Sequence, residues 1–120
     1  MSGYEILRKY IKKYIPSEEK KPIEHLAALT GYSEKQIKRI LSQNKNERPS
    51  LKICMIFMTA LKMTAYDGLE MVIWAGYTVA ELESYKHFNL INCEGLRDQI
   101  LDDYVSNSNN ISPKDFFKGI

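Results

Sequence analysis

The chain has 120 residues, of which 44% are apolar and 27% charged, and this fits one globular domain that can bury a core without a metal or disulfides. Its longest apolar run, residues 53–61, is shorter than the ~18 residues of a membrane span, and residues 1–5 lack the apolar core of a signal peptide, so we expect a cytoplasmic protein with no membrane partner. The net charge of +2 is uneven: residues 1–52 hold 12 Lys and Arg against 6 Asp and Glu, whereas residues 53–120 hold 5 against 9, and a basic first half attracts polyanions such as DNA.

The apolar pattern predicts consecutive helices with short breaks, because no stretch shows the sustained period-2 alternation of a strand. Residues 3–15 place their apolar side chains on one stripe and four basic side chains on the opposite face, which is typical of an amphipathic helix. Pro16 ends this helix, since proline lacks the N–H that a helix interior needs. A polar connector over residues 17–21 follows.

Two short helices joined by a tight turn come next. Pro22 suits the first position of a helix over residues 22–30, and Gly31 ends that helix because glycine adopts a left-handed backbone easily. Ser33 and Gln36 have the spacing of a capping box, which predicts a second helix at about 33–43.

The rest of the chain continues the helical pattern. Residues 51–63, capped by Ser50, are apolar nearly all round and predict a helix in the middle of a bundle. Further helices are expected over residues 65–75, closed by Gly76, from Thr78 to about residue 90, and over about 94–104.

These elements suggest three parts of the chain. Residues 1–77 form the principal domain, and the helices in 78–104 pack on the same core or form a dimer interface. Residues 105–120 are expected to be a flexible tail, because 106–110 contain only Ser and Asn and look like a linker.

The spacing around Gly31 leads to the functional prediction. Ala27, four residues earlier, is small enough for two helices to meet at a sharp angle, and Gly31 supplies a positive φ for the turn. Ile37 and Ile40 anchor the second helix by its inner side. Its outer face is then free to enter the major groove of DNA, which is wide enough for a helix.

This constellation resembles the helix-turn-helix family of Cro and lambda repressor, also called the Xre family. The resemblance covers about residues 4–77, and it is carried by Leu26, Ala27, Thr30, Gly31, Tyr32, Ser33, Ile37 and Ile40, then by Arg48-Pro49-Ser50, Ala60-Leu61-Lys62-Met63 and Trp74-Ala75-Gly76-Tyr77. It implies an all-α, compact, lambda-repressor-like helical bundle with a helix-turn-helix at about residues 22–43, followed here by a C-terminal helical extension. The chain departs from the family at Ile23, where Gln often contacts the DNA backbone, and at Asn44, where Gly is a common helix cap.

By this resemblance the chain is a sequence-specific duplex-DNA-binding transcriptional regulator of repressor type. The implied base-reading residues are Ser33, Glu34, Lys35, Lys38 and Arg39. Lys35 or Arg39 would donate to guanine O6 and N7, and Glu34 would accept from cytosine N4. Glu34 equally suits a first-turn acid that complements the helix dipole, so both interpretations stay open.

Four further basic residues are suited to phosphates, which determine how a protein docks rather than which sequence it reads. They are Lys20, Lys21, Lys45 and Arg48. Because one helix reads only ~4–5 base pairs, we also expect a homodimer that binds two half-sites.

Other functions have weaker signals. We find no catalytic motif, no metal-ligand spacing and no cofactor motif, so we do not expect an enzyme or a cofactor. The alternative is a protein-interaction module with a repurposed helix-turn-helix, such as an antitoxin, an anti-repressor or a nuclease inhibitor; the basic outer face argues for DNA instead.

Several single residues admit a structural and a functional interpretation. Cys54 and Cys93 are expected to be buried thiols, with a regulatory disulfide or thiol sensor as the alternative. His25 and His87 have no metal-site partner at helical spacing and are interpreted as surface or interhelix residues, and Trp74 as a core residue. The methionines are attributed to a helical core rather than to an adaptable ligand pocket.

Overall fold

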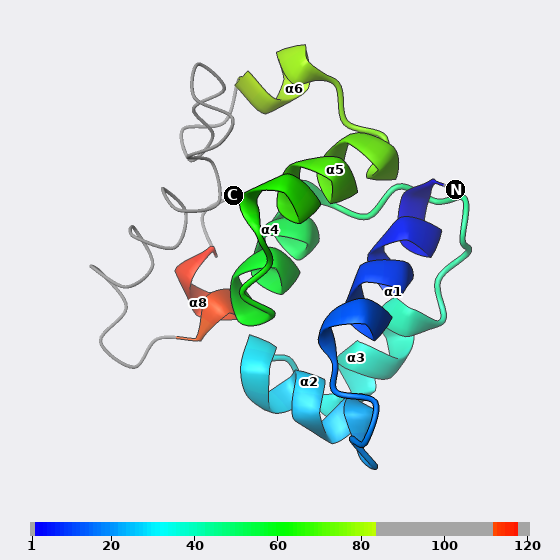
Figure 1. Ribbon diagram of the computed structural model, residues 1–120, viewed down its shortest axis with the longest axis vertical. Coiled ribbons are helices and arrows are strands. Elements are labelled where there is room, and N and C mark those ends of the chain that lie inside the picture. Colours follow the sequence, from blue (N-terminus) through cyan, green and yellow to red (C-terminus); the bar gives the residue numbers. More distant parts are fainter. Residues whose placement is uncertain (1, 84–111, 118–120) are drawn as a thin grey trace.

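The computed structural model describes residues 2–83 and 112–117, and all regular structure in these two stretches is α-helical (Figure 1). The helices are α1 (Gly3–Tyr14), α2 (Pro22–Thr30), α3 (Glu34–Leu41), α4 (Leu51–Ala60), α5 (Ala65–Ala75), α6 (Val79–Glu83) and α8 (Pro113–Phe116). The all-α prediction is thus confirmed for the described part of the chain. Within it, none of the helices combines the length and the apolar character of a membrane span.

Capping residues explain several helix boundaries. Ser50 Oγ accepts a hydrogen bond of 3.1 Å from the N–H of Ile53 at the start of α4, and Gly76, with a φ of 123°, ends α5 as predicted. The prediction for α4 extended to residue 63, but the helix ends at Ala60. The chain turns there because Lys62 adopts a left-handed φ of 51°, and the N–H of Met63 then donates to the carbonyl of Met58.

Helix α4 occupies the centre of the core and packs against α2, α5 and α8, while α1 packs along α5 (Figure 1). All residues from 54 to 60 are buried, as expected for a helix that is apolar nearly all round. The methionines at 55, 58, 63 and 71 are at most 1% exposed, so they are core residues. Cys54 is fully buried, and burial raises the pKa of its thiol to about 12, which suits a structural residue better than a thiol sensor.

The core assignment of Trp74 was wrong. Its side chain is 54% exposed, and Tyr66 and Ile73, also on α5, are 75% and 38% exposed. The inward stripe of α5 runs through residues 67, 68, 71, 72 and 75, which leaves Trp74 on the outer side of the helix. Both faces of α5 carry apolar residues, so the periodicity of the sequence does not reveal which face is buried.

The end of the chain differs from the expected flexible tail. Ser112 caps the short helix α8, whose N–H at Asp115 donates to Ser112 Oγ over 3.3 Å, and α8 packs against α4 and α2. Phe117 is fully buried in the core. Burial of this aromatic ring offsets the entropic cost of ordering the segment, and residues 112–117 therefore belong to the bundle.

Several predictions for the second half of the chain lie outside the described residues. The helix expected from Thr78 is seen only as α6, in which Leu82 is fully buried. The helix over 94–104, the linker over 106–110, Cys93 and His87 all fall between residues 84 and 111.

Candidate nucleic-acid interface

Helices α2 and α3 are joined by a tight turn that local hydrogen bonds hold in place. Gly31 has a φ of 89°, and its N–H donates to the carbonyl of Ala27 over 3.0 Å. The buried Thr30 hydroxyl donates to the Leu26 carbonyl over 2.8 Å and accepts from the N–H of Tyr32 over 3.1 Å. The Ala27 carbonyl and the N–H of Tyr32, which the end of α2 would otherwise leave unpaired, thus have partners, and the chain enters α3 in a defined direction.

The first turn of α3 carries the predicted capping box. Ser33 Oγ accepts from the N–H of Gln36 over 3.1 Å, and the Gln36 side chain accepts from the N–H of Ser33 over 3.0 Å. Two donors at the start of the helix are thereby satisfied reciprocally. This prediction, made from the two residues and their spacing, is confirmed.

The two faces of α3 have opposite character. Ile37 and Ile40 are 0% and 4% exposed, and they pack into the same core cluster as Leu26 of α2. All five residues predicted to read bases are exposed: Ser33, Glu34, Lys35, Lys38 and Arg39. Helical periodicity places 34, 35, 38 and 39 on one side of α3, so the structure brings the predicted set together on a single outer face.

The outer face of α3 is electropositive. It presents three cations, Lys35, Lys38 and Arg39, against the single carboxylate of Glu34. None of these four side chains has an ion-pair partner in the part of the chain that the structure describes. Their charges are therefore directed to solvent rather than used inside the fold.

Arg39 also lies close to the edge of the core. Burial raises the pKa of the Tyr32 hydroxyl, and the Arg39 guanidinium opposes this rise, as it does at Tyr4. Arg39 itself is exposed and has no ion-pair partner among the described residues, so its charge is accessible to an anion that approaches α3.

The far end of α3 is held by one of the four basic residues predicted on the outer face of the first helix. Arg8 of α1 donates from Nη1 to the carbonyls of Leu41 and Gln43, over 2.7 and 2.8 Å. Leu41 is the last residue of α3 and Gln43 lies two residues beyond it, where carbonyl groups have no N–H partner within the helix. A cation at a helix C-terminus is also favoured by the helix dipole. No local pattern indicates this contact, because 33 residues separate Arg8 from Leu41.

The loop after α3 is fixed by the start of α1. The N–H groups of Tyr4 and Glu5 donate to the carbonyls of Glu47 and Lys45, over 2.9 and 3.1 Å. Gly3 permits this approach, because a Cβ there would lie 2.4 Å from the Glu47 carbonyl oxygen, and its φ is 55°. Lys45 is exposed on this anchored loop, as its predicted phosphate role requires.

The two predicted phosphate residues before α2 are also exposed. Lys21 occupies the N-cap position of α2, and its Nζ lies 3.8 Å from Glu24 Oε2. The Lys21 side chain is 77% exposed, and such a surface pair contributes little. Lys20 and Lys21 are therefore accessible beside the start of α2, where a phosphate is favoured by the helix dipole.

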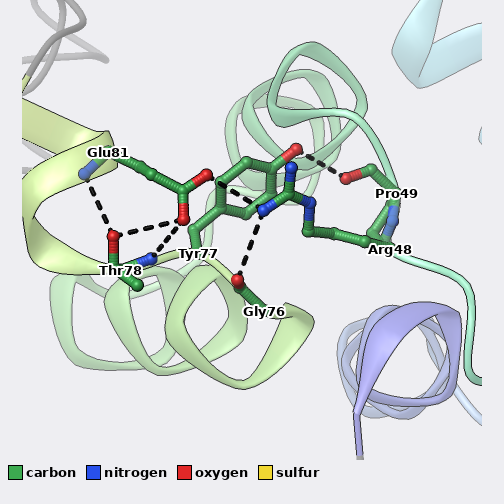
Figure 2. Close-up of polar contacts among 6 residues, drawn as sticks. All are labelled: Arg48, Pro49, Gly76, Tyr77, Thr78 and Glu81. Atoms are coloured by element: carbon green, nitrogen blue, oxygen red, sulfur yellow. Dashed lines mark hydrogen bonds and ion pairs between the residues drawn. The ribbon is translucent and has the colours of Figure 1, made fainter.

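Arg48, the fourth predicted phosphate residue, is occupied within the fold (Figure 2). Its Nη1 lies 2.9 Å from Glu81 Oε2 of α6 and 3.5 Å from the Gly76 carbonyl, and the guanidinium stacks 4.4 Å from the centre of the Tyr77 ring. Tyr77 in turn donates to the Pro49 carbonyl over 2.8 Å.

Arg48 therefore differs from the other predicted phosphate residues in having a structural contact. Arg48 joins the loop before α4 to the start of α6, and half of its side chain is exposed. The pKa of Glu81 is lowered, first by a backbone hydrogen bond from Thr78 and also by Arg48. With its carboxylate charged, Glu81 gives the Arg48 guanidinium an ion-pair partner, which neither Lys20 nor Lys45 has among the described residues.

Nothing in the described residues suggests other chemistry at this face. They contain no group of three or more His, Cys, Asp or Glu side chains that could hold a metal ion. His25 of α2 is half-buried, and its Nδ1 lies 3.6 Å from Oε2 of Glu19 in the connector before that helix. Scans against protein-family models, curated proteins and solved structures find no match to this chain, so its family membership stays a prediction.

Proposed function

We propose that this protein is a sequence-specific duplex-DNA-binding regulator, of repressor type, that inserts the outer face of α3 into the major groove. The observation that carries the proposal is that α3 buries its apolar side while Lys35, Lys38 and Arg39 stand exposed and unpaired among the described residues. A rigid helix with free cations on its outer face matches the width and the negative potential of the groove.

The proposed roles follow from side-chain chemistry. Lys35 and Arg39 donate to guanine O6 and N7, Ser33 donates to either a base or a phosphate, and Glu34 accepts from cytosine N4. Lys20, Lys21 and Lys45 hold phosphates beside α2 and after α3. Repression is then steric, because the bound protein occupies DNA that another protein would need.

The experiment is selection of bound fragments from a random duplex-DNA pool at near-physiological salt, followed by sequencing. Wild-type protein is compared with Lys35→Ala/Arg39→Ala and with Lys9→Ala/Lys62→Ala, which removes the same charge from exposed positions on α1 and after α4. An enriched motif that the α3 variant loses and the control variant keeps supports the proposal.

Two outcomes would oppose it. Binding without enrichment would mean that the basic half attaches to DNA by electrostatics alone. A motif that survives Lys35→Ala/Arg39→Ala would move base reading away from α3.

A protein-interaction module is the second candidate, and the exposed apolar side chains of α5 favour it. Tyr66, Ile73 and Trp74 are large and exposed on one helix, and aromatic residues are enriched where proteins bind each other. The same surface suits the homodimer that half-site reading requires.

Sedimentation equilibrium of wild type and Trp74→Ser at micromolar concentration separates these cases. A mass of two chains that falls to one chain in the variant supports a homodimer through α5. A single-chain mass for both proteins, together with no binding to the DNA pool, favours a different protein partner.

A further inference from the structure

A solvent-open cavity of about 770 Å³ lies between the C-terminal half of α1, the connector over residues 15–21, the start of α2 and the end of α3. Its volume is in the range of small-molecule sites. None of the residues predicted to read bases lines it. It is thus a separate feature of the fold from the outer face of α3.

The floor of the cavity is apolar. Its side chains come from α1, α2, α3 and the residue that follows α1, and they are Ile11, Tyr14, Ile15, Ile23, Leu26 and Leu41. Ile11 and Leu26 are buried, whereas the other four are half-buried and face the open space. A hydrocarbon chain placed there would remove apolar surface from water, which is the main favourable contribution to binding of this kind.

The rim is positively charged. Arg8, Lys12 and Lys13 line the cavity with one acidic residue, Glu19. Lys13 is paired with Asp67 over 3.0 Å, and Glu19 accepts from the Lys21 N–H over 3.0 Å and lies 3.6 Å from His25. Lys12 is exposed and has no ion-pair partner among residues 2–83 and 112–117.

Arg8 supplies a second cation with unused donors. Both of its hydrogen bonds within the described residues leave from Nη1 and go to the carbonyls of Leu41 and Gln43. The edge formed by Nε and Nη2 therefore keeps its N–H groups for another acceptor. That edge is the one that binds a carboxylate through two parallel hydrogen bonds.

We propose that this cavity binds a small monocarboxylate with an aliphatic chain, the carboxylate at Lys12 and Arg8 and the chain over Ile11, Ile15 and Ile23. Charge complementarity selects an anion, and the apolar floor selects a hydrocarbon body over a sugar or nucleotide. Lys13 is paired with Asp67, and Glu19 offsets one of the two remaining cations, so one carboxylate on the ligand balances the charge of the rim.

Arg8 links this site to α3. A carboxylate on the Nε and Nη2 edge leaves both bonds to the end of α3 in place, so the ligand restrains the side chain that holds that helix. If α3 reads DNA, an occupied cavity strengthens DNA binding, and this consequence rests on the function proposed above. The binding of the carboxylate itself does not.

The test is titration with decanoate, below its micelle concentration, of full-length protein labelled at the isoleucine δ1 methyl groups and observed by NMR. We expect saturable shifts at Ile11, Ile15 and Ile23 and little change at Ile53 and Ile73, which do not line the cavity. Decan-1-ol, which has the same chain without the charge, should bind about ten-fold more weakly, because it forms no charge-assisted hydrogen bonds.

Two charge reversals on α1 make the test specific. Lys12→Glu should weaken decanoate binding about ten-fold or more, whereas Lys9→Glu, an equal charge change at an exposed position outside the cavity, should leave it within about two-fold. Shifts that do not saturate, that are as large at Ile73 as at Ile23, or that respond equally to both variants would overturn the proposal.

A final arm separates this inference from the proposed function. Fluorescence anisotropy of a labelled duplex carrying the enriched motif, or of a random duplex if none is enriched, is measured with and without decanoate. Saturable methyl shifts in a protein that binds no DNA would support the carboxylate site and oppose only the DNA-binding proposal. Tight DNA binding without methyl shifts would oppose only the carboxylate site.

Discussion

The backbone of Gly31 lies against the side chain of Ser112, so closely that a Cβ on Gly31 would be 2.4 Å from Ser112 Oγ. This contact joins the turn between α2 and α3 to the N-cap of α8, which lies far from it in the sequence. Lys114 of α8 also lies over the ring of Tyr32, with its Nζ 5.7 Å from the ring centre. The C-terminal segment thus braces the turn that positions α3.

Gly31→Ala is expected to destabilise the protein by about 1–3 kcal/mol, because alanine would be held at a positive φ and would also collide with Ser112. Urea unfolding followed by circular dichroism measures this loss. The double variant Gly31→Ala/Ser112→Gly should recover the part of the lost stability that comes from the collision, while the part that comes from backbone strain remains. If the double variant were no more stable than Gly31→Ala, the contact between the turn and α8 would be unimportant.

Phe117→Ala should cost about 3–5 kcal/mol in unfolding free energy, since it empties a fully buried site between α8 and the rest of the core. Tyr66→Ala on α5, where the side chain is 75% exposed, is the matched aromatic control and should change stability by less than about 0.5 kcal/mol. Equal and small effects from both variants would mean that Phe117 is not part of the core and that the predicted flexible tail was right.

Local signals explain which parts of the fold were predictable. Pro22, Gly31, Ser33 with Gln36, and Ser50 each act within four residues along the chain, and the helices they delimit start and end close to the expected positions. The outer face of α3 followed from the same reasoning, because Ile37 and Ile40 identify the buried side.

What was missed depends on contacts between residues distant in sequence. Arg8 reaches the end of α3, Arg48 pairs with Glu81, and Phe117 enters the core, and each contact joins segments that lie far apart in the sequence. The prediction that Trp74 is buried was wrong for a different reason, since α5 is apolar on both its inner and outer sides. Composition and periodicity do not encode which of two apolar faces is covered.

Arg39→Ala should weaken binding to the selected DNA site by roughly 1–3 kcal/mol and relax specificity at one base pair, because a bidentate contact to a base would be lost. Its folding stability should change little, since the side chain is exposed. Competition binding with single-base variants of the site measures both effects. Unchanged affinity and unchanged base preference would remove Arg39 from the base-reading set.

Lys45→Ala and Arg48→Ala should differ in their effect on DNA binding, although the sequence predicts phosphate contacts for both residues. Lys45→Ala should weaken binding to all duplexes about equally and reduce the slope of log affinity against log salt by about 1. Arg48→Ala should leave that slope unchanged, because Glu81 and Tyr77 already hold the guanidinium. A slope reduced by Arg48→Ala and not by Lys45→Ala would reverse these assignments.

Asp67 is expected to make folding stability depend on acid pH. Burial alone would raise the pKa of this carboxyl, but hydrogen bonds from Tyr14 (2.5 Å) and Lys13 (3.0 Å) outweigh it and lower the pKa below its ordinary value. A carboxyl whose folded pKa lies below the unfolded value of ~3.9 stabilises the fold fully above that pH. The stabilisation is then lost as the pH falls through the folded pKa.

Asp67→Asn should therefore cost about 1–3 kcal/mol near pH 7, where hydrogen bonds to the charged carboxylate are lost, and progressively less as the pH falls below ~4. Urea unfolding from pH 7 down to pH 2.5 measures the difference between the variant and wild type. Tyr14→Phe should shift the same transition toward higher pH, because it removes the strongest of the bonds that favour the charged form while keeping the ring between α1 and α5. A stability difference independent of pH would mean that Asp67 acts through packing alone, and that the contact between α1 and α5 owes nothing to its charge.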